Sequence, residues 1–106
     1  MRTTVIGSYP LRYEELGPEA VVRSVEEQLA AGVELVSDGQ TRADMVSVYA
    51  GVLDGTEIRA ETGLNEKRLH IVGRVSLRDP SIFVEDFITA SKTAAGRARV
   101  KAIVTG

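Results

Sequence analysis

The chain has 106 residues, of which 43% are hydrophobic and 26% charged, a formal net charge of −2 and no cysteine. This composition is typical of one globular domain, expected over 1–106, and it excludes disulfides, thiolate metal sites and a cysteine nucleophile within the chain. Basic residues are not clustered and no apolar run approaches about 20 residues, so we expect a cytoplasmic protein with neither nucleic acid nor a membrane as partner.

The first part of the chain predicts a strand, a loop and a helix. Thr3 to Ile6 is β-branched and apolar, as in a buried strand, and 7–17 is typical of a loop. Pro18 suits the first turn of a helix, and Gly32 suits the left-handed residue just after its end. Between them, apolar residues recur at helical spacing, namely Val21, Val22, Val25 and Leu29.

The middle of the chain predicts a second strand, a second helix and a hairpin. The run 33–37 is strand-like and ends at Asp38-Gly39, a turn signal. The segment 42–53 has one apolar face and predicts a helix that Gly55 ends. From 56 to 77, two strand-like runs flank a polar centre and predict a β-hairpin.

The last part predicts a third helix and a third strand. Asp79 is a suitable N-cap, Pro80 suits the first turn, and Gly96 ends the helix. The apolar run 100–104 follows as a strand. Strands that alternate with helices imply parallel pairing and right-handed crossovers, so we predict an α/β fold.

Three motifs stand in order along the chain. They are Thr4-Val5-Ile6-Gly7-Ser8-Tyr9-Pro10, then Asp38-Gly39-Gln40 followed by Arg42-Ala43-Asp44-Met45-Val46, and finally Val100-Lys101-Ala102-Ile103-Val104-Thr105-Gly106. Together they resemble motifs of the catalytic domain of cobalamin-independent methionine synthase. The Asp-Gly-Gln variant is most similar to the short, single-barrel relatives found in archaea.

The resemblance implies the N-terminal portion of a (β/α)8 barrel with an inserted β-hairpin, with about three of the eight parallel strands present. It implies an enzyme like 5-methyltetrahydropteroyltriglutamate–homocysteine methyltransferase, which methylates the homocysteine thiolate to form methionine. In that family zinc holds the sulfur as a thiolate. The methyl donor is a methyltetrahydrofolate or, in some short relatives, a methylated corrinoid.

The resemblance also implies substrate-binding residues. Ile6, Gly7 and Ser8 match the segment that holds the amino-acid part of homocysteine. Gln40 stands where many members have a glutamate that binds the substrate ammonium group. If the chain is extended through Gly39, Asp38 points to the same side and can supply the missing carboxylate. The alternatives are that Asp38-Gly39 and Gly7-Ser8 are simply turns.

Further candidates lie at the mouth of the site, namely Arg42, Asp44 and Thr105. Helix capping is the alternative role for Asp44. His70, the one histidine, is expected to be a surface or hydrogen-bonded strand residue rather than a metal ligand. The family's zinc ligands, one His, one Glu and two Cys, lie beyond this segment, so we predict neither a metal site nor a catalytic residue within it.

The chain ends at a strand, where another helix is expected. We therefore predict that the isolated chain is inactive, and that its open strand edges associate with the remainder of a barrel or with a second copy. Two other functions stay open. One is a related thiol methyltransferase with a different acceptor, which Gln40 allows. The other is a non-enzymatic domain that binds a ligand or a partner through its open edge.

Overall fold

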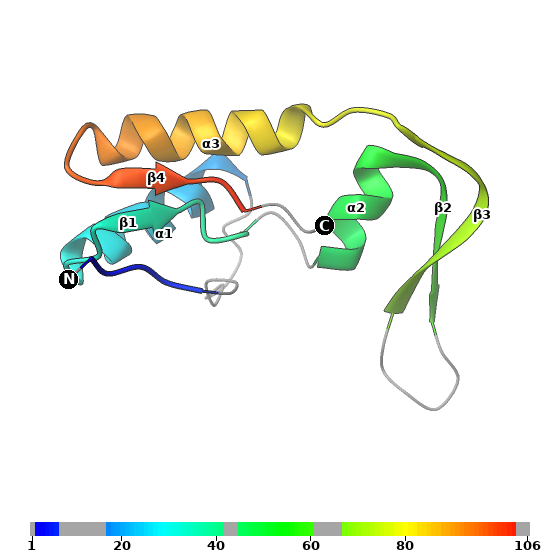
Figure 1. Cartoon of the computed structure of the whole chain (residues 1–106), viewed down its shortest axis with the longest axis horizontal. Helices are drawn as coiled ribbons and strands as arrows, with labels where there is room; N and C mark the ends of the chain where they lie inside the picture. The colour runs from blue at the N-terminus through cyan, green and yellow to red at the C-terminus, as the bar shows by residue number, and fades with distance from the viewer. Residues whose placement is uncertain (1, 7–16, 42–44, 61–66, 104–106) are drawn as a thin grey trace. The chain divides into compact units, whose positions relative to one another are not determined.

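The structure, a computed structural model, describes residues 2–6, 17–41, 45–60 and 67–103 (Figure 1). Its helices and strands, in chain order, are α1 (Pro18–Ala30), β1 (Leu35–Ser37), α2 (Met45–Val52), β2 (Leu53–Ala60), β3 (Lys67–Leu77), α3 (Ser81–Ala94) and β4 (Arg99–Lys101). They form two units, one of Met1–Arg42 with Ile82–Gly106 and the other of Ala43–Ser81. The first unit holds α1, β1, α3 and β4, and the second holds the remaining elements.

Helix α1 has the boundaries that its sequence predicts. Pro18 occupies the first turn, where its missing N–H leaves no helical hydrogen bond unmade. At the other end Gly32 has a φ of 80°. The N–H of Gly32 donates to the Leu29 carbonyl (3.0 Å), and the N–H of Val33 donates to the Gln28 carbonyl (3.0 Å). This is a Schellman motif, which requires a left-handed residue where Gly32 stands, so the predicted role of Gly32 is confirmed.

Helix α3 begins and ends at the predicted signals. The Asp79 carboxylate accepts a hydrogen bond from the backbone N–H of Ser81 at 3.0 Å, as an N-cap does. That bond lowers the pKa of Asp79 below its ordinary value, because the charged carboxylate is the better acceptor. After the helix, Gly96 has a φ of 80°. The Arg97 guanidinium then returns to donate to the Thr93 carbonyl at 2.8 Å, a favourable place for a cation.

The sheet of the first unit is parallel, as predicted. Strands β1 and β4 pair in the register Leu35↔Arg99, Val36↔Val100 and Ser37↔Lys101. On the opposite edge of β1, Thr4 makes a single parallel bridge to Leu35. The predicted first strand, Thr3 to Ile6, is therefore reduced to one bridge within the described residues, and the other two predicted strands are shorter than expected.

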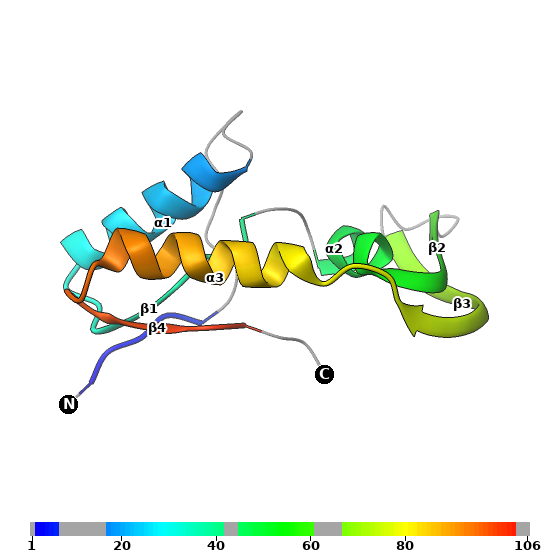
Figure 2. The ribbon, with the colours of Figure 1, turned by 90° about the horizontal axis from the view of Figure 1, so that it is seen from above.

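Helices α1 and α3 cover the same face of β1 and β4 (Figure 2). Their shared core contains residues of both helices and of β1, each at most 1% exposed: Val21, Val25, Val36, Ala90 and Ala94. Doubly wound sheets have helices on both faces, whereas barrels have them all on the outside. Among the described residues, both helices of this unit lie on one face of the sheet.

The second unit contains the predicted β-hairpin, which is confirmed. Strands β2 and β3 pair antiparallel, with a register shift between Asp54 and Thr56. Gly55 lies at the shift with a φ of 77°. A Cβ atom at Gly55 would overlap the backbone carbonyl of Arg74. Glycine is required there because it tolerates both the left-handed backbone and the close approach of the opposite strand.

The predicted end of the second helix is wrong. Helix α2 ends at Val52, and both Leu53 and Gly55 lie in β2. Leu53 pairs with Leu77 across the hairpin, so strand pairing overrides the helical periodicity at this position. Within the described ranges, no helix is long and apolar enough to cross a membrane.

Candidate functional site

The carboxyl ends of the parallel strands bring distant segments to one edge of the first unit. Because Thr4, β1 and β4 run in parallel, the residues that follow them emerge at the same edge (Figure 1). Such edges hold the ligands of α/β proteins. Three predicted substrate-binding residues lie here: Ile6 is 95% exposed, and Asp38 and Gln40 are half-buried. The other predicted residues lie outside the described ranges: Gly7, Ser8, Arg42, Asp44 and Thr105.

Asp38, Gly39 and Gln40 form a turn, as the Asp38-Gly39 signal predicts, so the condition of an extended chain through Gly39 is not met. Gly39 has a φ of 79° and Gln40 a φ of 52°. The Asp38 carboxylate accepts a hydrogen bond from the Gln40 backbone N–H at 2.9 Å. This is an Asx-turn, in which a side chain replaces a backbone acceptor. One carboxylate oxygen thus shapes the turn, and the second oxygen provides further acceptor capacity.

The turn is connected to α1 through Gln28, a residue that the sequence analysis did not single out. Gln28 is only 3% exposed. Its Nε2 donates to the Ser37 carbonyl at 2.9 Å, and its Oε1 accepts from the Ser37 N–H at 3.0 Å. A signal for this was present, because Val21, Val25 and Gln28 share one helical face. A polar residue within an apolar stripe indicates a specific buried partner.

Between β1 and residues 2–6, side chains take the place of some of the backbone hydrogen bonds that a pair of parallel strands would form. The Leu35 N–H donates to the Thr3 carbonyl at 3.0 Å, a regular parallel bond. The next two backbone carbonyls accept from side chains instead. Thr4 Oγ1 donates to the Leu35 carbonyl at 2.7 Å, and Lys101 Nζ donates to the Val5 carbonyl. These bonds explain why only one bridge forms. They also place Lys101, a further residue missed by sequence reasoning, at the backbone immediately before Ile6.

Thr41 follows the turn and is 1% exposed. Its hydroxyl is buried and finds no hydrogen-bond partner among the residues that the structure describes. Ser37 is equally buried, but its Oγ accepts a hydrogen bond from the Gly39 N–H at 3.2 Å. Two buried polar side chains therefore flank the turn, one on each side.

His70 lies in the other unit, in the hairpin. It stands opposite Glu57 in the register of β2 and β3. The residue is half-buried in β3, so its predicted place in a strand is confirmed. Its Nε2 atom is buried and has no hydrogen-bond partner within the described part of the chain, so the expected hydrogen bond is not seen at that atom. No group of three or more His, Cys, Asp or Glu residues that could hold a metal ion occurs among the described residues.

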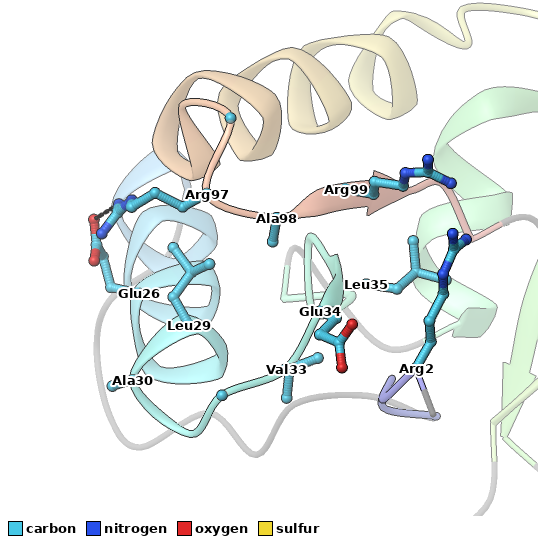
Figure 3. Close-up of a pocket in the computed structure, with 12 residues that line it drawn as sticks. Arg2, Glu26, Leu29, Ala30, Val33, Glu34, Leu35, Arg97, Ala98 and Arg99 are labelled. Atoms are coloured by element: carbon cyan, nitrogen blue, oxygen red, sulfur yellow. Dashed lines mark hydrogen bonds and ion pairs between the residues drawn. The ribbon is translucent and has the colours of Figure 1, made fainter.

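A hollow of about 920 Å³ lies at the opposite edge of the sheet, at the amino ends of β1 and β4 (Figure 3). Arg2, Glu34 and Arg99 line it, together with Arg97, whose guanidinium pairs with Glu26 at 3.0 Å. Ligands of parallel α/β sheets are held at the carboxyl edge rather than the amino edge. We therefore assign the candidate site to the carboxyl edge and not to this hollow.

Fold and site together define the class: an α/β protein with parallel strands, helices on one face, and a polar turn at the carboxyl edge. No protein-family model matches the chain. The methionine synthase of Methanocaldococcus jannaschii is 30% identical over 95% of this chain and 40% of its own length. That of Methanothermobacter marburgensis is 33% identical over 100% of this chain and 39% of its own length.

A solved structure agrees with these relatives. The B12-independent methionine synthase from Shewanella sp. W3-18-1, in complex with selenomethionine, has a TM-score of 0.64 and 27% identity, covering 88% of this chain and 35% of that protein. The predicted resemblance is thus confirmed: the chain is similar to part of these methionine synthases, one of which is B12-independent. It spans about two fifths of the length of the two archaeal relatives.

Proposed function

We propose that this chain forms part of the homocysteine pocket of a zinc-dependent methyltransferase of the methionine synthase type, which methylates the homocysteine thiolate to give methionine. The observation that carries the proposal is that Asp38 and Gln40 lie at the same carboxyl edge as Ile6, because these residues belong to separate motifs of the resemblance. The selenomethionine in the Shewanella protein supports it, since selenomethionine is the selenium analogue of methionine.

The fold that we propose around this pocket is a (β/α)8 barrel. The bridge at Thr4, β1 and β4 are neighbours in one parallel sheet, in the order in which they occur in the chain. Helices α1 and α3 cover one face of that sheet. Sequential parallel neighbours with one-sided cover are what the first strands of a barrel require. The hairpin of β2 and β3 is then the excursion between the second and third barrel strands.

In this pocket we assign the amino-acid end of the substrate to two segments. The backbone of Ile6 and Gly7 and the hydroxyl of Ser8 bind the carboxylate, since backbone donors and a hydroxyl suit an anion. The Asp38 carboxylate binds the ammonium group through a charge-assisted hydrogen bond. Gln40, a neutral amide, adds a polar contact without charge. Binding both groups fixes the direction in which the substrate sulfur points.

The proposal also concerns the residues at the mouth of the site and the zinc ion of such enzymes. Arg42, Asp44 and Thr105 are proposed to line the mouth. Zinc, when bound in such enzymes, keeps the substrate sulfur as a thiolate. The residues of this chain do not fit a zinc site, because the chain has no cysteine and a single histidine, in the hairpin. The role that we assign to this chain is therefore to bind and orient the amino acid.

Gln40 supports a second candidate function, that of a related methyltransferase with a different thiol acceptor. A glutamine at this position cannot form the ion pair that a glutamate forms with a substrate ammonium. An acceptor without a free amino group would not need that ion pair. The two candidates differ in acceptor and not in reaction, so one assay separates them.

The test is a chimera in which this chain replaces the matched segment of the M. marburgensis methionine synthase, which aligns with 100% of it. Methionine formation from L-homocysteine is measured with methyltetrahydrofolate or methylcobalamin as donor, and other thiols serve as competing acceptors. We expect methionine with one of the two donors. A chimera that folds, as judged by circular dichroism, but methylates another thiol in preference supports the second candidate. A folded chimera that methylates no thiol while the parent enzyme does contradicts both.

A further inference from the structure

Gln28 is a buried amide within the apolar core face of α1. It shares that face with Val21 and Val25, which are both fully buried. Burial of a primary amide is unfavourable unless its donors and acceptor are all used. Here Nε2 has three acceptors for its two N–H groups, namely the Ser24 carbonyl (3.1 Å), Ser24 Oγ (3.0 Å) and the Ser37 carbonyl (2.9 Å), so one N–H is shared between two of them. Its Oε1 accepts from the Ser37 N–H (3.0 Å). The amide is therefore held by specific partners.

The pairing of Gln28 with Ser37 imitates a neighbouring strand. Ser37 is the last residue of β1 and is completely buried. On that edge of β1, the described residues contribute one backbone bridge, at Thr4, so the ladder does not continue to Ser37. By bonding both the N–H and the carbonyl of Ser37, Gln28 satisfies the two groups that strand pairing would otherwise satisfy.

The hydrogen bonds continue from Ser37 into the turn. Ser37 Oγ accepts from the Gly39 N–H at 3.2 Å, and Asp38 Oδ1 accepts from the Gln40 N–H at 2.9 Å. The turn needs this support because Gln40 has a φ of 52°, which is unfavourable for a residue with a side chain. Hydrogen bonds thus connect Gln28 in the core of α1 with Ser37, and Ser37 with Gly39, within the turn that also contains Asp38 and Gln40.

We propose that Gln28 is a positioning residue for the substrate pocket: it fixes the end of β1 and so sets where Asp38 and Gln40 point. This inference rests on the proposed function only in assigning Asp38 and Gln40 to the substrate. The positioning itself concerns the turn and can be measured without any ligand.

The first experiment measures amide hydrogen exchange by NMR in the intact chain. The test variant is Gln28→Met, which keeps the length and burial of the side chain and removes all of its hydrogen bonds. The matched control is Val25→Ala, which loosens the same helix without touching the turn. We expect the amides of Ser37, Gly39 and Gln40 to exchange at least about tenfold faster in Gln28→Met than in Val25→Ala. Equal acceleration in the two variants would overturn the proposal.

A second variant covers the case in which Gln28→Met does not fold. Ser37→Ala removes the hydroxyl that accepts from Gly39 but leaves Gln28 and the backbone of Ser37 in place. Faster exchange confined to Gly39 and Gln40 supports the series of bonds, and unchanged exchange there contradicts it.

The last readout links the turn to the substrate. In the M. marburgensis chimera, Gln28→Met is expected to raise the homocysteine KM about tenfold with a smaller change in kcat, whereas Val25→Ala leaves KM unchanged. A KM that both variants leave unchanged overturns the positioning role. If the unmutated chimera does not use homocysteine, the proposed function fails, and the exchange experiment still decides whether Gln28 positions the turn.

Discussion

Replacing Asp38 by asparagine separates the two roles that the structure gives to this residue. One oxygen of Asp38 accepts from the Gln40 N–H at 2.9 Å and shapes the turn. An asparagine side chain makes the same Asx-turn with its amide oxygen, so Asp38→Asn keeps the turn and removes only the negative charge. Asp38→Ala removes both, which makes it the matched comparison.

The expected changes in KM and in the free energy of unfolding follow from the strength of the hydrogen bonds that Asp38 makes. A hydrogen bond to a charged group contributes about 1.5–3 kcal/mol, and each 1.4 kcal/mol changes an affinity tenfold. Asp38→Asn should therefore raise the homocysteine KM of the chimera by about 10- to 150-fold. The free energy of unfolding should change by less than about 0.5 kcal/mol in Asp38→Asn. In Asp38→Ala it should fall by about 1 kcal/mol, because the turn bond is lost.

The assay combines steady-state kinetics with urea unfolding of the same preparations. An unchanged homocysteine KM in Asp38→Asn would refute the assignment of the substrate ammonium to Asp38 and leave the turn as its only role. A loss of stability in Asp38→Asn as large as in Asp38→Ala would refute the interpretation of the 2.9 Å contact as an Asx-turn.

Two predictions concern the fold. Gly55→Ala should destabilise the hairpin by about 2–4 kcal/mol in urea unfolding, because its φ of 77° and the carbonyl facing it exclude a Cβ. Gly73→Ala is the control, since the nearest atom to its added Cβ is 3.9 Å away, and equal effects would contradict the reasoning. The pKa of Asp79 is lowered in the folded chain, so its stabilisation is complete above the ordinary carboxyl pKa of about 3.9 and is lost as the pH falls through the folded value. Asp79→Asn keeps the capping hydrogen bond but has no group that titrates, so its free energy of unfolding should fall less steeply as the pH is lowered. An acid-unfolding curve equal to that of the unmutated chain would contradict this role of Asp79.

Local signals predicted much of the fold because their causes are local. Gly32 and Asp79 mark helix ends through bonds to residues within three positions of each, and such bonds are encoded in the neighbouring sequence. The hairpin followed from two strand-like runs around a polar centre, and the parallel pairing followed from the alternation of strand-like and helical segments. The end of α2 was missed because Leu53 is held by Leu77, a partner 24 positions away that periodicity does not reveal.

The sequence predicted where Asp38 and Gln40 lie in the chain's fold and left their conformation open, and their role in binding a substrate stays a prediction. The motifs placed Asp38 and Gln40 after a parallel strand, and the structure has them there. Their turn conformation depends on the side chain of Asp38 and on Gln28, nine residues before Ser37, and neither bond is visible in a pattern of apolar residues. The partial loss of the first strand has the same origin, because Lys101 bonds to Val5 from 96 positions away.

The most direct test of the proposed pocket is a crystal structure of the M. marburgensis chimera with bound selenomethionine. Selenium can be located independently by its anomalous scattering, so the position of the ligand does not depend on the protein model. We predict that the ligand carboxylate lies at Ile6 to Ser8 and that its ammonium group lies within hydrogen-bond distance of Asp38. Selenomethionine bound elsewhere, for example in the hollow at the amino ends of β1 and β4 beside Arg2 and Arg99, would contradict the account.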